Sequence, residues 1–272
     1  MTSIKAPTPP TAPTDRFVQV TEFEGQKISA EQLDRLCHRY HFAAHYCADR
    51  DVVEAGCGAG HGLGLFAQTA RSVLGGDLSP EVLAAARQTY GNAIRLEVFP
   101  ADRIPLADRS ADLVLLFEAI YYLPDVNAFM AEVDRVLRPG GHLLIATANK
   151  DLFDFTPSPF SNRYLGVAEL SALMRGHGYE PSFWGYVDVS KVSLRQRLFR
   201  PIKYLANRFG IMPKTMGGKS ILKKLVFGAM TEMPARIDSI PFDYVEPAPL
   251  VMDSPSHDYK VIYCAALKPK ES

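Results

Sequence analysis

The feature that most constrains the fold of this chain is the run Ala111–Phe117, ADLVLLF, which is apolar at every position but one. A strand that faces solvent on one side alternates apolar and polar residues, whereas a continuous apolar run is typical of a strand buried on both faces. Such strands occur in parallel sheets that carry helices on each side. The run therefore predicts a sheet with helices packed against both of its faces.

Further strands and helices alternate along the chain around this run. Ser79 followed by Pro80 is typical of a helix start, and Gly178 is typical of a helix end. The pattern predicts an α/β fold with a seven-stranded, mostly parallel sheet, whose ligand binds at the carboxyl ends of the central strands. The remaining strands are expected over residues 51–55, 72–77, 94–100, 142–148, 181–189 and 259–267, and the helices over 28–46, 60–70, 79–90, 124–137 and 167–177.

The chain divides into three parts. Residues 1–27 begin with a stretch rich in proline and threonine, a composition that favours a disordered leader. This stretch lacks the apolar segment that a signal peptide needs. Residues 28–189 and 257–268 are expected to form the main domain. Residues 190–256 are expected to form a basic helical insert, followed by a proline-rich loop that returns to the last strand.

Charge and cysteine content narrow the class of protein. Lys plus Arg is 30 and Asp plus Glu is 30, so the net charge of zero gives no indication of a nucleic-acid partner. The four cysteines form no CxxC pair, which favours reduced thiols in a cytoplasmic protein. No run approaches the roughly 18 apolar residues of a membrane-spanning helix.

A glycine-rich loop follows the first expected strand, in the sequence Glu54-Ala55-Gly56-Cys57-Gly58-Ala59-Gly60. Glycines allow a sharp turn and a close approach of the backbone to a ligand. The spacing is GxGxG, unlike the GxGxxG of dinucleotide-binding proteins, and the preceding Glu54 would repel phosphate but suits a cation. Asp77 ends the second strand, where an acid can accept both ribose hydroxyls. Together these residues indicate a cationic nucleoside.

Four segments together resemble class I, Rossmann-like S-adenosylmethionine-dependent methyltransferases, in the small-molecule branch related to quinone and sterol methyltransferases. The resemblance covers roughly residues 40–189 and the last strand. It implies a Rossmann-like fold, S-adenosyl-L-methionine as cofactor, and methyl transfer to a small-molecule acceptor. The segments are EAGCGAGHG, GGDLS, ADRIPLADRSADLVL and RVLRPGGHLLI.

The resemblance also implies roles for individual residues around the cofactor. Asp77 would hold the ribose and Leu78 would pack beside the adenine, whose amino group Asp102 and Arg103 would flank. Tyr40 is a candidate for the carboxylate end of the cofactor. The remaining residues would lie near its methionine moiety, and they are Glu54, Gly56, Gly58, Gly60 and the backbone near Phe117.

Methyl transfer is an in-line displacement that positioning alone can largely catalyse, but a hydroxyl or carbon-acid acceptor must also lose a proton. Related enzymes often carry two histidines after the fourth strand, where this chain has Tyr121 and Tyr122, so a histidine base is absent there. Glu118 could act as the base if it is partly desolvated. Glu118, Tyr121 and Tyr122 are therefore the catalytic candidates, although packing or contact with solvent would equally explain them.

The loop after the fifth strand is expected to cover the acceptor. Its polar residues are either acceptor contacts or ordinary loop polarity, and they are Asn149, Ser158, Ser161 and Tyr164.

The segment 191–224 carries ten basic residues and no acid. Apolar stripes beside basic faces are typical of helices that lie on anionic membranes, so peripheral membrane contact through 191–227 is one interpretation. A lid for an anionic acceptor and a solvated helical cap are the other two. The basic residues are Lys191, Arg195, Arg197, Arg200, Lys203, Arg208, Lys214, Lys219, Lys223 and Lys224.

The sequence also bears on several alternatives to this interpretation. Nucleic-acid amino-methyltransferases share an Asp/Asn-Pro-Pro-Tyr/Phe motif where this chain has FEAIYY, which argues against base methylation. Cys37 and His45 would lie ~12 Å apart along one helix, too far to share one metal ion with His41. His41 and His45 alone could ligate a metal, but core or surface histidines are the favoured interpretation, so no metal is expected. The GxGxG spacing and Glu54 argue against a nicotinamide-dependent oxidoreductase. A non-catalytic cofactor-binding protein, recruited through the basic insert, stays open beside a methyltransferase that acts on a sugar, lipid-linked or other metabolite hydroxyl.

Overall fold

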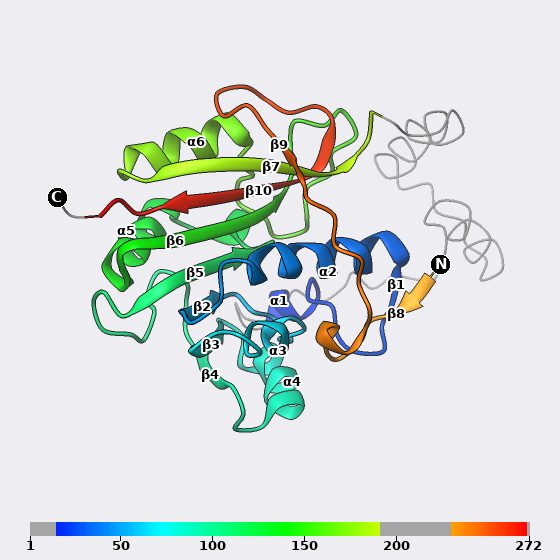
Figure 1. The fold of residues 1–272 in the computed structure, drawn as a ribbon. Coiled ribbons are helices and arrows are strands. Elements are labelled where there is room, and N and C mark those ends of the chain that lie inside the picture. Colours follow the sequence, from blue (N-terminus) through cyan, green and yellow to red (C-terminus); the bar gives the residue numbers. More distant parts are fainter. Residues whose placement is uncertain (1–14, 191–229, 271–272) are drawn as a thin grey trace, which may run out of the picture.

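The structure is a computed structural model that describes residues 15–190 and 230–270 (Figure 1). Two sheets and the helices around them make up this part of the chain. In chain order, the elements are α1 Asp15–Val18, β1 Lys27–Ser29, α2 Ala30–Ala44, β2 Asp51–Ala55, α3 Leu63–Phe66, β3 Ser72–Asp77, α4 Pro80–Tyr90, β4 Arg95–Val98, β5 Ala111–Phe117, η1 Ile120–Tyr122, α5 Val126–Val136, β6 Leu137–Ala148, α6 Val167–Gly176, β7 Glu180–Asp188, β8 Met230–Glu232, η2 Ile237–Ser239, β9 Ala248–Pro249 and β10 Tyr259–Leu267.

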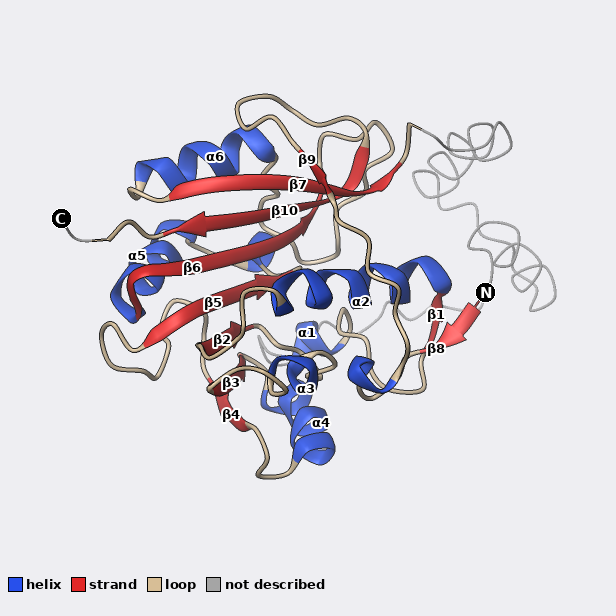
Figure 2. Ribbon diagram, in the orientation of Figure 1, coloured by secondary structure: helices blue, strands red, loops and turns tan. Residues whose placement is uncertain are grey.

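The main sheet runs in the order β4-β3-β2-β5-β6-β10-β7-β9 (Figure 2). The pairs from β4 to β6 are parallel, while β10 lies antiparallel to both β6 and β7. The predicted α/β fold is therefore confirmed, with one additional strand: the two-residue β9 pairs with the edge of β7 and is too short to predict from an apolar pattern. Strand order reverses between β2 and β5, which places a ligand site at their carboxyl ends.

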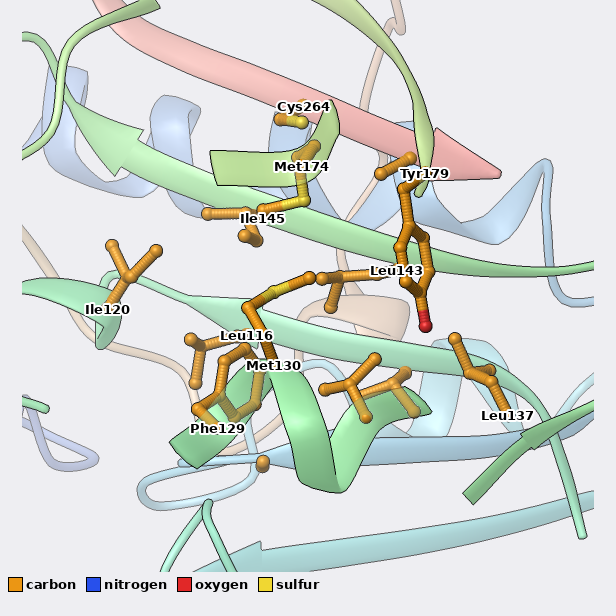
Figure 3. Close-up of a cluster of buried hydrophobic side chains, with 14 of the residues drawn as sticks. Leu116, Ile120, Phe129, Met130, Leu137, Leu143, Ile145, Met174, Tyr179 and Cys264 are labelled. Carbon is orange, nitrogen blue, oxygen red and sulfur yellow. The ribbon is translucent and has the colours of Figure 1, made fainter. Parts of the chain in front are cut away.

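Both faces of the sheet are buried, as the run ADLVLLF predicts. Leu113 and Leu115 pack with residues of α2, and the intervening Val114 and Leu116 pack with residues of α5 and α6. Figure 3 shows the second of these clusters, in which Phe129 and Met130 of α5 lie against the strands. Alternate side chains of one strand thus enter two separate cores.

Two expected boundaries differ from the structure. The helix predicted over 60–70 is only the four-residue α3, because Gly60 has a left-handed φ of 78° and Gly62 lies directly under a ring. The strand predicted over 142–148 begins earlier, at Leu137, which pairs with Ala111. The intervening Gly140 donates its N–H to the carbonyl oxygen of Lys268, so this segment continues the sheet.

The predicted leader needs correction at its carboxyl end. Residues 15–29, named the strap here, contain the helical turn α1 and the strand β1. The strand β1 pairs antiparallel with β8, far along the chain, and thereby ties the strap to the segment that returns toward the last strand. The ten basic residues of 191–224 lie outside the described residues, and the described part of the insert, 230–256, contains the elements β8, η2 and β9.

The close packing of Gly76 against Phe99 gives a test of the fold. A Cβ atom at Gly76 would lie 2.0 Å from Cε1 of Phe99, so Gly76→Ala should lower the free energy of unfolding by about 1–3 kcal/mol. A Cβ atom at Gly176 in α6 would meet nothing within 4 Å, so Gly176→Ala should leave stability unchanged or raise it slightly. Urea denaturation of both variants measures the difference, and equal stability would contradict this packing.

Candidate functional site

A cavity of about 320 Å³ lies at the carboxyl ends of the central strands, partly beneath the strap. It gathers most of the residues that the sequence predicts for the site. Those that line the cavity are Tyr40, Gly56, Gly58, Asp77, Leu78, Asp102, Phe117, Glu118 and Tyr122. The predicted residues outside its lining are Glu54, Gly60, Arg103 and Tyr121.

The glycine-rich loop follows β2 and has the conformation that its sequence allows. Gly56, Gly58 and Gly60 have φ values of 72°, 57° and 78°, in the left-handed region that favours glycine. The N–H of Cys57 donates to the carbonyl oxygen of Gly76, at 2.8 Å, which holds the loop against β3. Gly60 lies outside the cavity because it packs on α4, where a Cβ would lie 2.9 Å from Ala86. The two glycines on the cavity side leave backbone exposed to a ligand.

Glu54 lies beneath this loop and is fully buried. Its Oε1 accepts a hydrogen bond of 2.6 Å from the Tyr40 hydroxyl, and its Oε2 has no hydrogen-bond partner. Burial raises the pKa of the Glu54 carboxyl to about 7 against the hydrogen bond from Tyr40, which lowers it. The ring of Tyr40 lines the cavity, while its hydroxyl is directed to Glu54.

Asp77 lies at the end of β3 and faces the cavity from below the loop. Its Oδ2 accepts from the N–H of Gly58 at 3.0 Å, and its Oδ1 accepts from the N–H of Ser79 at 2.9 Å. Burial raises the pKa of this carboxyl. Each carboxylate oxygen has two lone pairs, so both can accept one further hydrogen bond from a ligand.

Phe99, which the sequence does not predict as a site residue, forms the wall next to Asp77. Its ring packs on Gly76, which has no side chain, and it lines the cavity together with the 40% exposed Leu78. The pair Gly75-Gly76 within a strand was the available indication, since glycine in a strand often marks close packing. Asp102 lies at the exposed rim of this end, and Arg103 is exposed outside it.

Glu118 follows β5 with a left-handed φ of 49°, which is unusual for a residue with a side chain. Its Oε2 accepts from the Tyr121 hydroxyl at 3.1 Å, and its Oε1 lies 3.9 Å from Nη1 of Arg39. Arg39 also lines the cavity, and its Nε is buried without a hydrogen-bond partner. Strained backbone of this kind persists where the surrounding structure fixes it, often at functional sites.

The residues around Glu118 were only partly foreseen. Arg39 was missed, although it precedes the predicted Tyr40 on the same helix. Burial raises the pKa of the hydroxyls of both Tyr121 and Tyr122. Neither phenol is therefore an effective proton acceptor near neutral pH, which leaves Glu118 as the acid–base candidate of the three.

The strap supplies a wall of the cavity that sequence reasoning assigned to a disordered leader. Phe17, Val20, Thr21 and Glu22 all line the cavity. His61 joins the glycine-rich loop to the strap and to the returning segment, because Nε2 lies 3.0 Å from the carbonyl oxygen of Glu22 and Nδ1 3.3 Å from that of Ala235. The strap is thus fixed over the loop.

The structure also locates the residues considered for a metal. His41 stacks on Phe242 and His45 packs against Tyr244, and within residues 15–190 and 230–270 no group of three potential ligands is suited to a metal ion. The four cysteines are free and buried. No helix in the described ranges is long and apolar enough to cross a membrane.

Comparison with known proteins identifies similar chains. Residues 53–145, from β2 to β6, match the family model described as a methyltransferase domain. A "Probable S-adenosylmethionine-dependent methyltransferase" of Mycolicibacterium smegmatis is 41% identical over 147 residues, which are 52% of this chain and 56% of that protein. A malonyl-(acyl-carrier protein) O-methyltransferase of Pectobacterium atrosepticum is 33% identical over 133 residues, 49% of this chain and 47% of the relative.

These matches are partial, since the chain spans about half the length of the curated relatives it matches. A solved structure described as a SAM-dependent methyltransferase from Thermotoga maritima has the same fold, with a TM-score of 0.53, 17% identity, and coverage of 93% of this chain and 97% of that one.

Glu54 gives a pH-dependent test of the site. Its pKa is about 7 in the folded chain and 4.5 ordinarily, so the folded state keeps a proton that the unfolded state loses as the pH rises through this window. The free energy of unfolding therefore falls as the pH rises from about 4.5 to about 7.

Glu54→Gln keeps an acceptor for Tyr40 and removes this titration. Relative to wild type, its free energy of unfolding should rise by about 2 kcal/mol between pH 5 and pH 8 in urea denaturation. The exposed Glu24 provides the matched control, because Glu24→Gln should show no such change. A Glu54→Gln curve parallel to that of wild type would contradict the burial of an acid with a raised pKa.

Proposed function

Because the chain carries a class I, S-adenosylmethionine-dependent methyltransferase domain, we propose that it transfers the methyl group of S-adenosyl-L-methionine to a hydroxyl oxygen of a small-molecule acceptor. The observation that carries this proposal is one cavity that brings together the glycine-rich loop, Asp77 and Glu118. Several relatives with named acceptors are O-methyltransferases, including the malonyl-(acyl-carrier protein) enzyme and a fatty-acid O-methyltransferase. They support an oxygen acceptor.

The residues present fit the cofactor. Gly56 and Gly58 have no side chains, so the methionine moiety can approach their backbone closely. Asp77 retains acceptor capacity for the ribose hydroxyls, and Phe99 with Leu78 offers apolar surface to the adenine. Asp102 at the rim could accept from the adenine amino group.

Arg39 is our proposed partner for the carboxylate of the methionine moiety. The hydroxyl of Tyr40, the earlier candidate, already donates to Glu54. Arg39 lies one position before Tyr40 on the helix and lines the cavity, and its Nε is buried without a hydrogen-bond partner. Guanidinium groups recognise carboxylates through several aligned N–H donors.

When bound, the cofactor supplies a methyl group that the positive sulfur has already activated. The chain then has two tasks: it holds the acceptor oxygen in line with the methyl group, and it takes the hydroxyl proton. We assign the second task to an oxygen of the Glu118 carboxylate. Tyr121 and Arg39 fix this carboxylate from two sides, at 3.1 Å and 3.9 Å. The closed strap helps to keep water from the reacting atoms.

A second function, cofactor binding without catalysis, depends on recruitment through residues 191–227. These residues lie outside the part of the chain that the structure describes. Membrane contact through the same residues likewise stays a proposal from the sequence.

Replacement of Asp77 tests the cofactor site. Asp77→Ala removes the ribose acceptor and should weaken binding of S-adenosylhomocysteine at least tenfold in isothermal titration calorimetry. Asp77→Asn is the milder control, because its amide oxygen can still accept from one of the two backbone N–H groups that Asp77 bonds. Urea denaturation shows whether each variant is folded. Equal affinity of folded Asp77→Ala and wild type would rule out the ribose role.

Replacement of Glu118 tests the chemistry. Glu118→Gln should lower kcat by about 10²–10⁴-fold in an assay of tritiated methyl transfer to a panel of hydroxylated small molecules. Its affinity for S-adenosylhomocysteine should stay within about threefold of wild type, since only the proton acceptor is lost. Tyr122→Phe is the control and should retain most activity. Full activity of Glu118→Gln would show that Glu118 is not the base.

A further inference from the structure

The turn Ser158–Ser161, in the loop after β6, holds an aromatic residue in a conformation that favours glycine. The N–H and Oγ of Ser161 both donate to the carbonyl oxygen of Ser158, at 3.3 Å and 2.7 Å, which closes the turn. Pro159 occupies its second position, and Phe160 the third, with a φ of 65°. The third position of a type II turn requires a positive φ and is normally glycine or asparagine. Phenylalanine there is strained, and its side chain is 40% exposed.

Hydrogen bonds fix this strained turn to the mouth of the cavity. The Ser158 hydroxyl bonds to the hydroxyl of Tyr122, a cavity-lining residue. Beyond the turn, the N–H of Asn162 donates to the carbonyl oxygen of Tyr121 at 2.7 Å, and its side-chain amide donates to that of Tyr122 at 2.8 Å. Hydrogen bonds on both sides of Phe160 therefore tie the turn to η1, and Phe160 lies two residues from Ser158, which contacts the cavity-lining Tyr122.

The cavity lining near Tyr122 includes several apolar residues, beside the charged Glu22 and Asp125. Phe17 packs edge-on against Tyr122, with ring centroids 5.8 Å apart, and both line the cavity together with Val20, Leu123 and Pro124. A volume of about 320 Å³ is at the low end for small-molecule sites, and this cavity must hold both a nucleoside cofactor and the reacting end of the acceptor. The rest of any larger acceptor extends beyond the mouth.

We propose that Phe160 is a specificity-determining residue that binds an aliphatic chain of the acceptor outside the cavity. This inference rests on the proposed function and adds a substrate class: amphiphilic alcohols, whose hydroxyl lies at Glu118 and whose chain passes Tyr122 and leaves over the turn. The backbone conformation supports this role, because a positive φ at an exposed aromatic residue lowers stability and such strain often occurs at functional sites.

Binding of 1-hexanol, 1-octanol and 1-decanol tests this inference. Calorimetry is performed on wild type and Phe160→Gly, both saturated with S-adenosylhomocysteine. In wild type, the Kd should fall roughly tenfold for each two methylenes that become buried. Phe160→Gly should bind 1-hexanol as wild type does and 1-decanol about tenfold more weakly. Its melting temperature should rise, because glycine adopts a positive φ without strain. A residue with only a structural role would not lower affinity while raising stability.

Val245→Ser is the matched control. The side chain of Val245 is 66% exposed, and its carbonyl oxygen contacts His38 of α2. Helix α2 covers one face of the sheet, whereas Tyr121 packs in the core on the other face, so Val245 lies away from the turn. The Val245→Ser variant should bind the three alcohols with the same Kd values as wild type. The inference is overturned if Phe160→Gly keeps the full dependence on chain length, or if wild type shows no such dependence. A failure of the proposed function is recognised separately, because the protein would then not bind S-adenosylhomocysteine at all. The alcohol series is therefore also measured without S-adenosylhomocysteine, to show whether alcohol binding depends on it.

Discussion

The hydrogen bond between the Tyr40 hydroxyl and the buried Glu54 carboxyl is the contact on which the site depends. It joins α2 to the end of β2, at the point where strand order reverses. Tyr40 thereby covers Gly62, where a Cβ would lie 2.0 Å from the ring, and the neighbouring Arg39 comes within 3.9 Å of Glu118. The strap follows, because β1 continues directly into α2. This one buried polar contact thus helps to position the glycine-rich loop, the pair of Arg39 and Glu118, and the strap.

Two kinds of residue near the cavity have a positive φ: glycines, and residues that carry a side chain. The glycine-rich loop uses residues that adopt this conformation without strain. Glu118 and Phe160 adopt it with side chains, and at both positions several hydrogen bonds hold the surrounding backbone. In the proposed account, Glu118 takes the proton of the substrate hydroxyl, and Phe160 provides an aromatic contact for the substrate chain. Asp49, Arg109 and Val187 also have a positive φ, away from the cavity lining, so Glu118 and Phe160 stand out by their position and not by strain alone.

The sequence predicts the strands well and the cover of the site poorly. The bounds of β5 and β10 agree with the predicted ranges, because apolar runs buried on both faces are unambiguous. The strap was mistaken for a disordered leader, since its order comes from pairing with residues about 200 positions away. Arg39 and Phe99 are not predicted for a related reason, because their roles arise from tertiary contacts with Glu118 and with Gly76. The pair Gly75-Gly76 indicates close packing but does not identify the residue that packs there.

The central claim is that the cavity binds a cationic nucleoside sulfonium cofactor and its thioether product, and not a dinucleotide. The most direct measurement is a thermal-shift comparison of the full chain with S-adenosylhomocysteine and with NADH. The melting temperature should rise with S-adenosylhomocysteine, since a ligand that binds only the folded state stabilises it, and should not change with NADH. No shift at millimolar S-adenosylhomocysteine, or a larger shift with NADH, would contradict the account.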